Sequence, residues 1–223
     1  MEVEITDSFA LLAFLKGKEF LPKMESNCNF SDKKHWWWPN ALSFEVVVGA
    51  ILVQNTRWEQ VEFALDVLKA KSVLNVESLS EMPQEFLQEY LRNIGFFRQK
   101  AVRLQMLCCN ILSDFGDYPN FCESVDREWL LGQKGIGFES ADVILNYALG
   151  REIMVADAYT YKLLKSFGYT LESYEAMQEW LIQGVIENYA KVCTLYGFMI
   201  PLNLLFARFH GKIVEYAKNL RRK

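Results

Sequence analysis

The chain has 223 residues, of which 51% are hydrophobic and 23% are charged, so it can bury a sizeable core and is not a disordered polypeptide. Its longest uninterrupted apolar run, Val46–Val53, is too short to cross a bilayer, so no membrane partner is expected. The net charge of −4 argues mildly against a nucleic-acid partner, since phosphate-binding proteins are usually basic, although a local basic face can occur on an acidic protein.

The dominant period of the apolar residues is helical. Phe44, Val47 and Ile51 lie on one stripe at positions i, i+3 and i+7, and similar stripes recur in later segments. These segments cover residues 61–70, 101–111, 163–167 and 202–216. No long stretch alternates apolar and polar residues, so the sequence predicts an all-α fold with almost no sheet.

Cysteine use predicts a reducing compartment. The chain has five cysteines, an odd number, and no C-x-x-C motif, so neither a disulfide framework nor a zinc site is expected. The acidic start Met1–Glu4 lacks the basic and apolar regions of a signal peptide. We therefore expect a cytoplasmic protein.

The most informative motif is Gly135-Ile136-Gly137. It separates a helix predicted to end near Gly132 from one predicted over Ser140–Leu149. Two glycines allow positive φ and a close approach of the backbone to a ligand, while Ile136 would anchor the turn in the core. The free N–H groups of the following helix can then bind a phosphate. A tight turn without any ligand is the alternative, and it is the more common meaning of a bare Gly-x-Gly.

Four motifs in order resemble the helix-hairpin-helix DNA glycosylases of the endonuclease III superfamily. The similarity extends over about Ala41–Lys218, and Asp157 follows Gly137 by twenty positions, as the family pattern requires. The motifs are the helix Phe44–Asn55 that ends in a Gln, the G-x-x-x-x-K-A segment Ile94–Ala101, the hairpin Lys134–Asp142, and Val155–Asp157 before a helix.

The resemblance implies the architecture and the partner. It implies an all-α protein, one unit over residues 1–223, with two helical lobes and a cleft that binds DNA and a base. The approximate lobes are 77–161, which carries the hairpin, and 1–76 plus 162–223. The partner would be double-stranded DNA containing alkylated bases, and a monomer is expected.

The resemblance makes Asp157 the catalytic residue. A carboxylate can stabilise the positive charge that develops on the sugar as the N-glycosidic bond breaks, or can activate the attacking water. The alternative is a helix N-cap, a role that Asp fills well and that is compatible with catalysis. Gln54 matches the residue that fills the gap left by an extruded base.

DNA contacts are expected from several polar residues near the motifs. Gln54 could also be a polar residue at a helix end, and each basic residue could be a solvated surface charge. The residues expected to bind DNA are Gln54, Lys134, Gly135, Gly137 and Ser140, with further phosphate contacts open to Arg57, Arg98, Lys100 and Arg103.

At two positions this chain differs from the family pattern, and these differences argue against a lyase step and against an iron–sulfur cluster. Relatives that also cut the DNA backbone carry a Lys where this chain has Glu139, and a carboxylate cannot form an imine, so we expect a monofunctional glycosylase. Glu215 stands where the first cysteine of the family's iron–sulfur cluster would be, and no cysteine follows Cys193, so no cluster is expected. Whether a monovalent cation binds under the hairpin carbonyls is left open.

The segment Trp36-Trp37-Trp38-Pro39 resembles that of the bacterial type III 3-methyladenine DNA glycosylases, which implies N3-alkylated purines as substrates. Three adjacent Trp cannot all face one core, so some are expected to form a stacking wall for a flipped cationic base and the rest to be core. The residues expected at the base pocket are Trp37, Trp38, Pro39, Trp58, Lys212 and Glu139. An exposed Lys on the polar face of its helix is the alternative for Lys212.

Three rival functions remain at this stage. A glycosylase/lyase for oxidised bases is disfavoured by Glu139 and by the missing cluster. A non-catalytic helix-hairpin-helix module that only binds DNA is disfavoured by Asp157 and by the tryptophans. An acidic helical interaction protein would bind no duplex at all.

Overall fold

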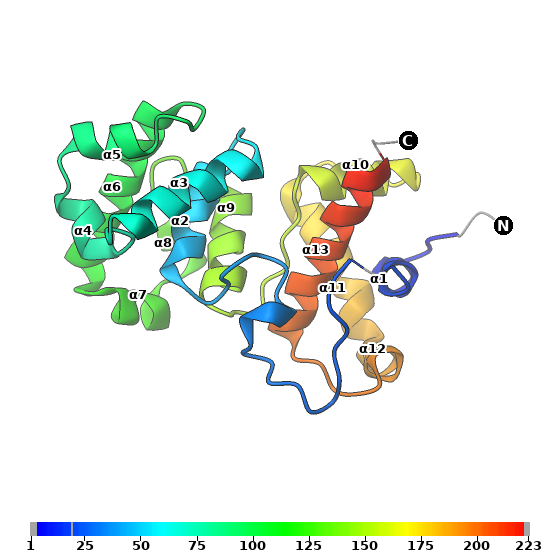
Figure 1. Cartoon of the computed structure of the whole chain (residues 1–223). Coiled ribbons are helices and arrows are strands. Elements are labelled where there is room, and N and C mark those ends of the chain that lie inside the picture. Colours follow the sequence, from blue (N-terminus) through cyan, green and yellow to red (C-terminus); the bar gives the residue numbers. More distant parts are fainter. Residues whose placement is uncertain (1–3, 19, 221–223) are drawn as a thin grey trace. The chain divides into compact units, whose positions relative to one another are not determined.

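The computed structural model describes residues 4–18 and 20–220, and the regular structure of these residues is entirely helical (Figure 1). The predicted all-α fold is therefore confirmed. The first helices are α1 (Ser8–Lys16), the short 3-10 helix η1 (Lys33–His35), α2 (Phe44–Leu52), α3 (Trp58–Ala70), α4 (Val76–Glu81), α5 (Gln84–Tyr90) and α6 (Phe97–Phe115). The later ones are α7 (Tyr118–Ser124), α8 (Arg127–Leu131), α9 (Phe138–Val143), the π-helical turn η2 (Ile144–Ala148), α10 (Ala158–Ser166), α11 (Tyr174–Glu187), α12 (Tyr189–Tyr196) and α13 (Leu202–Leu220). None of the helices described here is both long and apolar enough to span a membrane.

The chain divides into two compact units. The central unit is Leu42–Ile144, and the terminal unit combines the chain up to Ala41 with the chain from Leu145 onward. These boundaries differ from the expected lobes, because residues 42–76 belong with the hairpin and residues 145–161 belong with the two ends of the chain. The reason is packing: α2 and α3 contact the helices around α6, whereas α10 contacts α13.

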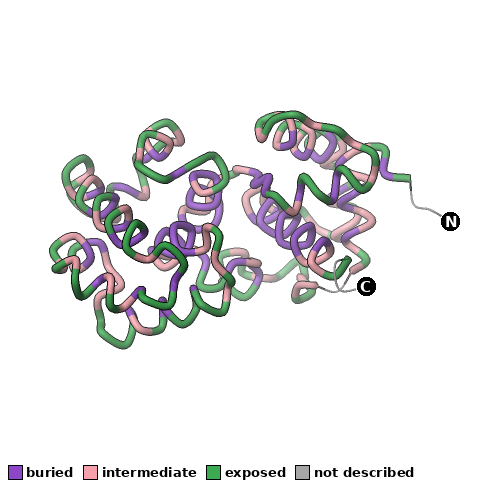
Figure 2. Tube along the Cα trace, turned by 90° about the horizontal axis from the view of Figure 1, so that it is seen from above, coloured by how far each residue is buried: buried purple, intermediate pink, exposed green. Residues whose placement is uncertain are grey.

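The core of the central unit surrounds α2. Eight of its nine residues are buried, so the helix is apolar on all sides and must be enclosed by others. The long helix α6 buries one face at helical spacing, which includes Ala101, Leu104 and Ile111, and this face packs against α2, α4 and α5. The buried turns of the trace in Figure 2 mark this interior.

The core of the terminal unit is built around α13. This helix packs against α1 and α10, and α1 also packs against α11. Leu205, Phe209 and Ile213 of α13 are completely buried, together with Leu11 and Leu15 of α1. Most of α13 is buried, so its polar residues must find partners inside the protein.

The helix that follows the hairpin changes its winding at the boundary of the two units. The sequence predicted one helix over Ser140–Leu149, but the structure has α9 followed directly by the π-helical turn η2. A π turn inserts an extra residue into a helix and is often found at functional sites. Here it carries Tyr147, whose hydroxyl donates a hydrogen bond to the carbonyl of Ala207 in α13 at 2.7 Å.

Candidate functional site

Asp157 is the N-cap of α10 and is 8% exposed. Its Oδ1 accepts hydrogen bonds from the backbone N–H of Thr160 at 2.8 Å and from the Thr160 hydroxyl at 3.0 Å. Its Oδ2 lies 3.5 Å from Nε2 of His210. Burial favours the neutral acid, but the His210 ring and the two Thr160 donors favour the carboxylate more strongly, so the pKa of Asp157 lies below its ordinary value. The N-cap role is thus real, and it leaves Oδ2 available for chemistry.

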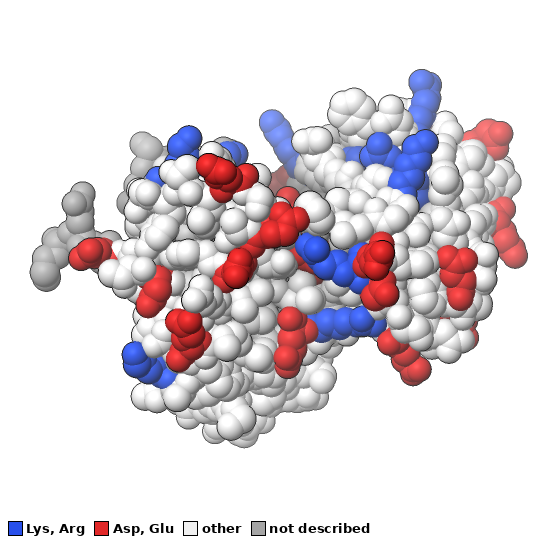
Figure 3. Space-filling model, turned by 180° about the vertical axis from the view of Figure 1, so that it is seen from behind, with Lys and Arg blue, Asp and Glu red and all other residues white. Residues whose placement is uncertain are grey.

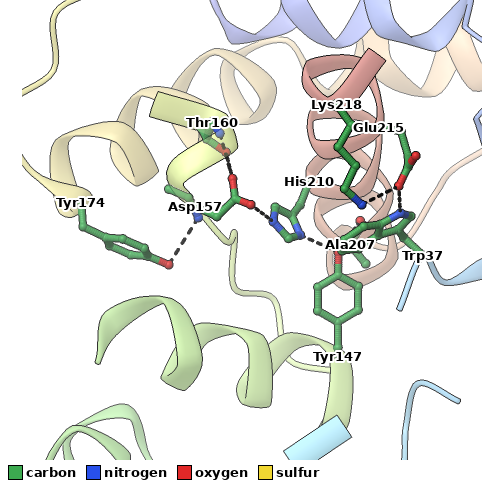
Figure 4. Close-up of polar contacts among 10 residues, drawn as sticks. Trp37, Tyr147, Asp157, Thr160, Tyr174, Ala207, His210, Glu215 and Lys218 are labelled. Carbon is green, nitrogen blue, oxygen red and sulfur yellow. Dashed lines mark hydrogen bonds and ion pairs between the residues drawn. The ribbon is translucent and has the colours of Figure 1, made fainter. Parts of the chain in front are cut away.

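His210 of α13 connects Asp157 to a buried tyrosine (Figure 4). Its Nδ1 is 2.8 Å from the hydroxyl of Tyr147, and the opposite ring nitrogen faces the carboxylate. Tyr147 has no exposed surface, and burial together with the nearby Asp157 charge raises its pKa well above the ordinary value. The Tyr147 hydroxyl is therefore protonated at neutral pH.

Trp37 lies beside His210 and Tyr147 and is the half-exposed member of the segment Trp36–Trp38. Its ring is perpendicular to the His210 ring at a centroid distance of 5.3 Å, and its indole N–H donates to Oε1 of Glu215 at 3.3 Å. The ring also lies against Gly211: a Cβ at that position would come within 2.3 Å of Trp37 Cγ. Gly211 is therefore needed because the indole occupies the space of its missing side chain.

The other members of the tryptophan segment have different environments. Trp36 and Trp38 are 5% and 6% exposed, and both rings lie within about 6 Å of the Tyr147 ring, at 6.2 and 5.7 Å between centroids. Pro39 is exposed. Two tryptophans thus belong to the core, and Trp37 is the half-exposed one, which lies beside His210.

Lys212 is buried, so the expectation of an exposed lysine on the polar face of its helix is wrong. It is 3% exposed, and its amine donates to the carbonyls of Leu15 and Lys18 at 3.1 and 2.9 Å. These carbonyls lie at the C-terminal end of α1, where a cation is favoured by the helix dipole. Burial, with smaller effects from Arg208 and Lys16, lowers the pKa of Lys212 to about 8.

The hairpin of the central unit uses its two glycines differently. Gly135 has φ of 88°, a left-handed conformation, and a Cβ there would come within 2.6 Å of the Arg103 side chain. Gly137 has an extended backbone with φ of −101°, so positive φ is found at only one of the two glycines. A Cβ on Gly137 would meet no atom within 4 Å. Ile136 between them is 7% exposed and anchors the turn, as predicted.

Gln54 lies outside the helix that was expected to carry it. The sequence predicted a helix reaching Asn55, but α2 ends at Leu52 and Asn55 adopts φ of 52°. The Gln54 amide donates to the carbonyl of Gly135 at 2.9 Å and to the hydroxyl of Ser140 at 3.1 Å. The turn after α2 and the hairpin are therefore joined through this side chain.

Lys100 also fixes the turn that follows α2. Its amine donates to the carbonyls of Leu52 and Gln54 at 2.9 and 2.7 Å and to the hydroxyl of Thr56 at 2.7 Å. It is 2% exposed, so the phosphate contact considered for it is wrong. Burial, with a smaller effect of Arg103, lowers the pKa of Lys100 to about 8. The lysine of the G-x-x-x-x-K-A motif thus fixes the backbone around Gln54.

The remaining predicted site residues belong to the central unit and lie near its surface. Trp58 begins α3 and is half-buried. Lys134 and Glu139 are exposed on the hairpin and on the first turn of α9. Asp157, Trp37, Trp38, Pro39 and Lys212 belong to the terminal unit. The structure thus groups the predicted residues into two sets, one on each unit.

Three residues of interest were not singled out from the sequence. Tyr147 and His210 lie next to Asp157, and the available signal was that His210 is one of only two histidines in the chain. Phe96 precedes α6 with φ of 58° and is 68% exposed. A large aromatic side chain that is both exposed and in a strained backbone is a signal for function that only coordinates reveal.

The surface charge is mixed. Lysine and arginine side chains occur among the acidic ones on the face shown in Figure 3, so the net negative charge does not prevent basic groups from reaching a ligand. Within residues 4–18 and 20–220, no three His, Cys, Asp or Glu side chains are grouped so as to hold a metal ion.

Comparison with known proteins identifies a matching family and several similar proteins. The model of the HhH-GPD superfamily of base excision DNA repair proteins matches residues 48–184. A protein of Methanocaldococcus jannaschii named as a DNA repair glycosylase is 33% identical over 193 residues, which cover 84% of this chain and 82% of the relative. The solved structure of H. pylori 3-methyladenine DNA glycosylase (MagIII) bound to 1,N6-ethenoadenine is 43% identical, with a TM-score of 0.86 over 96% of this chain and 98% of that one. A trapped covalent endonuclease III–DNA intermediate is 19% identical, with a TM-score of 0.64 over 84% and 78%, and shows likeness of fold alone.

Proposed function

Because the chain belongs to the HhH-GPD superfamily of base excision DNA repair proteins, we propose that it is a monofunctional DNA glycosylase that releases N3-alkylated purines such as 3-methyladenine. The family and the fold agree with the resemblance found in the sequence. The substrate class is supported by the similarity to MagIII, a 3-methyladenine glycosylase, over almost the whole length of both chains. The observation that carries the proposal is the buried carboxylate of Asp157, with His210 between it and the half-exposed ring of Trp37.

Asp157 is the proposed catalytic residue. Its pKa lies below the ordinary value, so it is negatively charged at neutral pH, as stabilisation of an oxocarbenium-like sugar requires. Oδ1 is occupied by Thr160, so Oδ2 is the oxygen proposed to face the sugar or the attacking water. An N3-alkylated purine is cationic and leaves as a neutral base, so no general acid is required.

Trp37 is the proposed wall of the base pocket. A cation over an indole face gains roughly 0.5–2 kcal/mol, and a neutral purine gains less, which gives selectivity for alkylated bases. The Glu215 carboxylate that accepts the indole N–H makes the ring a better partner for a cation. Trp38 and Pro39 complete the segment, while Trp58, Glu139 and Lys212 remain proposed pocket residues on the resemblance alone.

The central unit is proposed to hold the DNA backbone and the gap left by the flipped base. A Cβ on Gly137 would meet no atom within 4 Å, and Gly137 is the N-cap of α9, whose dipole favours an anion such as a phosphate. Gln54 is proposed to enter the gap, with its backbone held by Lys100, and the exposed Phe96 is proposed to stack on the duplex nearby. Lys134 and Ser140 are proposed to add polar contacts to the strand.

The reaction is proposed to proceed without a lyase step, an iron–sulfur cluster or another cofactor. Glu139 has no nucleophilic amine, and Glu215 stands at the position of the first cluster cysteine of relatives. Double-stranded DNA with alkylated bases is the proposed partner of a monomeric enzyme. We also propose that a monovalent cation binds at the hairpin carbonyls. The test is whether DNA affinity depends on which monovalent cation the buffer contains.

The deciding experiment is base release from methylated duplex DNA, followed by chromatography. Asp157→Asn keeps the N-cap of α10, since Asn caps as well as Asp, but removes the charge. We expect the wild type to release 3-methyladenine and the variant to be slower by about 10²–10³-fold, with DNA affinity retained. Binding by both proteins with no release by either would instead indicate a non-catalytic DNA-binding module.

The absence of a lyase step has its own test. Borohydride reduces an imine between a lysine and the sugar to a stable covalent bond, which gel electrophoresis detects. We expect no adduct between this protein and either methylated duplex or an abasic duplex, with a bifunctional endonuclease III as the positive control. A trapped adduct with the wild type would contradict the monofunctional proposal and would point to another amine as nucleophile.

A further inference from the structure

The stretch of the terminal unit that carries Trp37 has little regular structure of its own. Residues 20–41 contain no helix other than the three residues of η1. Because few of its backbone groups are paired within a helix, such a stretch takes its position from contacts with the rest of the protein. The place of the Trp37 ring therefore depends on what holds the backbone that leads to it.

Arg208 of α13 holds this backbone at two points. Its Nη1 donates a hydrogen bond to the carbonyl of His35 and its Nη2 to the carbonyl of Pro22, both at 2.7 Å. His35 is the last residue of η1 and lies two positions before Trp37, whereas Pro22 is much earlier in the stretch. The donors of a guanidinium form a rigid planar fork, so the two carbonyls are held in one fixed geometry.

Burial makes Arg208 a costly residue for packing alone. It is 3% exposed, and its hydrogen-bond partners are neutral carbonyls. Burial lowers the pKa of Arg208, and the groups that raise it, Tyr196 and Cys28, are not carboxylates. An apolar side chain of similar volume commonly fills a buried site as well as a charge does, or better. The guanidinium is therefore better explained by the two carbonyls that it fixes than by the packing of α13.

The contacts of Arg208 continue along one face of α13. Gly211 and Glu215 follow Arg208 at i+3 and i+7, which places the three residues on one stripe of the helix. Gly211 lies against the Trp37 ring, and Glu215 accepts the hydrogen bond of its indole N–H. Two of these residues thus contact the ring itself, and Arg208 fixes the backbone from which the ring projects.

From this geometry we infer that Arg208 is a positioning residue of the base pocket: by holding the carbonyls of Pro22 and His35 it sets where the Trp37 indole stands against an extruded base. This inference rests on the proposed glycosylase function. Asp157 is held separately, by the two donors of Thr160. Arg208 therefore acts on base release through Trp37 and not through the carboxylate.

A double-mutant cycle tests this dependence. Arg208→Met keeps an apolar side chain but donates to neither carbonyl, and Trp37→Ala removes the ring that Arg208 is inferred to place. Single-turnover base release from methylated duplex is measured for each variant and for the pair, with the spontaneous rate subtracted. We expect Arg208→Met to slow release about tenfold in the wild-type background and less than about twofold in Trp37→Ala. The same loss in both backgrounds would overturn the inference.

Two further variants separate positioning from folding. Arg208→Lys keeps a cation that can donate to a carbonyl, and we expect it to lose less than about threefold. Tyr189→Phe is the matched control, because it removes a hydrogen bond from another side chain of the terminal unit to a loop carbonyl, that of Ile200 at 2.6 Å. Its base release should stay within about twofold of the wild type.

Affinity for DNA without a base provides the control on the fold. A duplex with a stable abasic analogue has no base for Trp37 to hold, so every variant should bind it within about twofold of the wild type. If Arg208→Met weakens this binding as much as it slows base release, Arg208 supports the fold and does not position Trp37.

A spectroscopic measurement needs no activity. The chain has six tryptophans, so the full chain labelled with 5-fluorotryptophan gives a ¹⁹F spectrum in which Trp37 is assigned by its loss in Trp37→Phe. We expect the Trp37 resonance to shift in Arg208→Met while those of Trp58 and Trp129, in the central unit, stay in place. An unchanged Trp37 resonance would overturn the inference even if base release falls. If the wild type releases no base, the proposed function fails, and the ¹⁹F spectrum still decides whether Arg208 places Trp37.

Discussion

Two glycines, one in each unit, show how differently the two sets of candidate site residues are determined. Gly211 of the terminal unit is in contact with Trp37, which occupies the space of its side chain, whereas Gly137 of the central unit faces nothing within 4 Å. The first glycine is explained by the packing of the protein itself. The second is not explained by its φ angle or by a contact within the described part of the chain, and a DNA phosphate is the neighbour that we propose for it. The terminal unit thus holds a prearranged, buried set of groups, and the central unit presents a surface.

Among variants that test this comparison, the largest expected effect comes from Gly211→Ala. The new Cβ would come within 2.3 Å of Trp37 Cγ, so the indole must move, at a cost of about 1–3 kcal/mol in stability and with loss of the pocket wall. We expect base release to fall by more than about tenfold, measured by single-turnover kinetics and thermal melting. Gly184→Ala is the matched control, since its Cβ would come within 2.6 Å of Ser8 in the same unit, away from Asp157. Equal loss of activity in both variants would make the effect one of stability alone.

Lys100→Met should have the next largest effect, on the central unit. It leaves the oxygens of Leu52, Gln54 and Thr56 without their donor, which we expect to cost about 1–3 kcal/mol in the free energy of unfolding and to weaken DNA binding through Gln54. Denaturant unfolding measures the first effect. Arg98→Met removes an exposed cation from the same helix and should change stability by less than about 0.5 kcal/mol. If both variants unfold alike, Lys100 does not fix the turn.

The sequence predicted the helices well, but it did not predict which lysines are buried. The helices were predictable because their apolar residues recur with helical period, and α2, a continuous apolar run, is buried on nearly all sides. Asp157 was singled out by its spacing to the hairpin, and its catalytic role stays a prediction. A phosphate contact was considered for Lys100, and an exposed position was the alternative for Lys212, since a lone lysine is usually solvated. Nothing in the sequence shows that each would meet carbonyls at the end of another helix.

The partners of Asp157 and the path of the chain at Gln54 were also beyond the sequence. Tyr147 reaches His210 because a π turn rotates the end of a helix, and no residue pattern announces that turn. The helix expected to reach Asn55 ends at Leu52 because Lys100 satisfies the last carbonyl from a distant segment. Both features depend on tertiary contacts that override local preference.

Gly137→Ala should produce a smaller and more selective effect. The φ of −101° suits alanine and no protein atom lies within 4 Å, so we expect an unchanged melting temperature. A methyl group above the hairpin would hinder a phosphate, and we expect DNA affinity to fall about threefold to tenfold in fluorescence anisotropy. Gly135→Ala, with φ of 88° and the Arg103 clash, should lose stability as well. Unchanged affinity in Gly137→Ala would leave this glycine without a function.

The smallest expected effect is a pH dependence of stability in the terminal unit. The pKa of Lys212 is about 8 in the folded protein and about 10.4 in an unfolded chain, so between these values the unfolded state binds more protons. The free energy of unfolding contributed by Lys212 therefore rises with pH across this window and is flat below it. Lys212→Met should lack this rise when denaturant unfolding is compared with the wild type from pH 7 to 10. Parallel curves for the two proteins would mean that Lys212 keeps its ordinary pKa.

The terminal unit is made from two stretches of chain that the whole central unit separates. During synthesis, Trp36–Trp38 leave the ribosome long before α13, the helix that lies against Trp37, has been made. At about 5–20 residues per second this delay is of the order of ten seconds, during which the central unit can already fold. During that time the three indole rings lack the helix that Trp37 packs against, so we expect a chain that stops before α13 to leave this segment exposed.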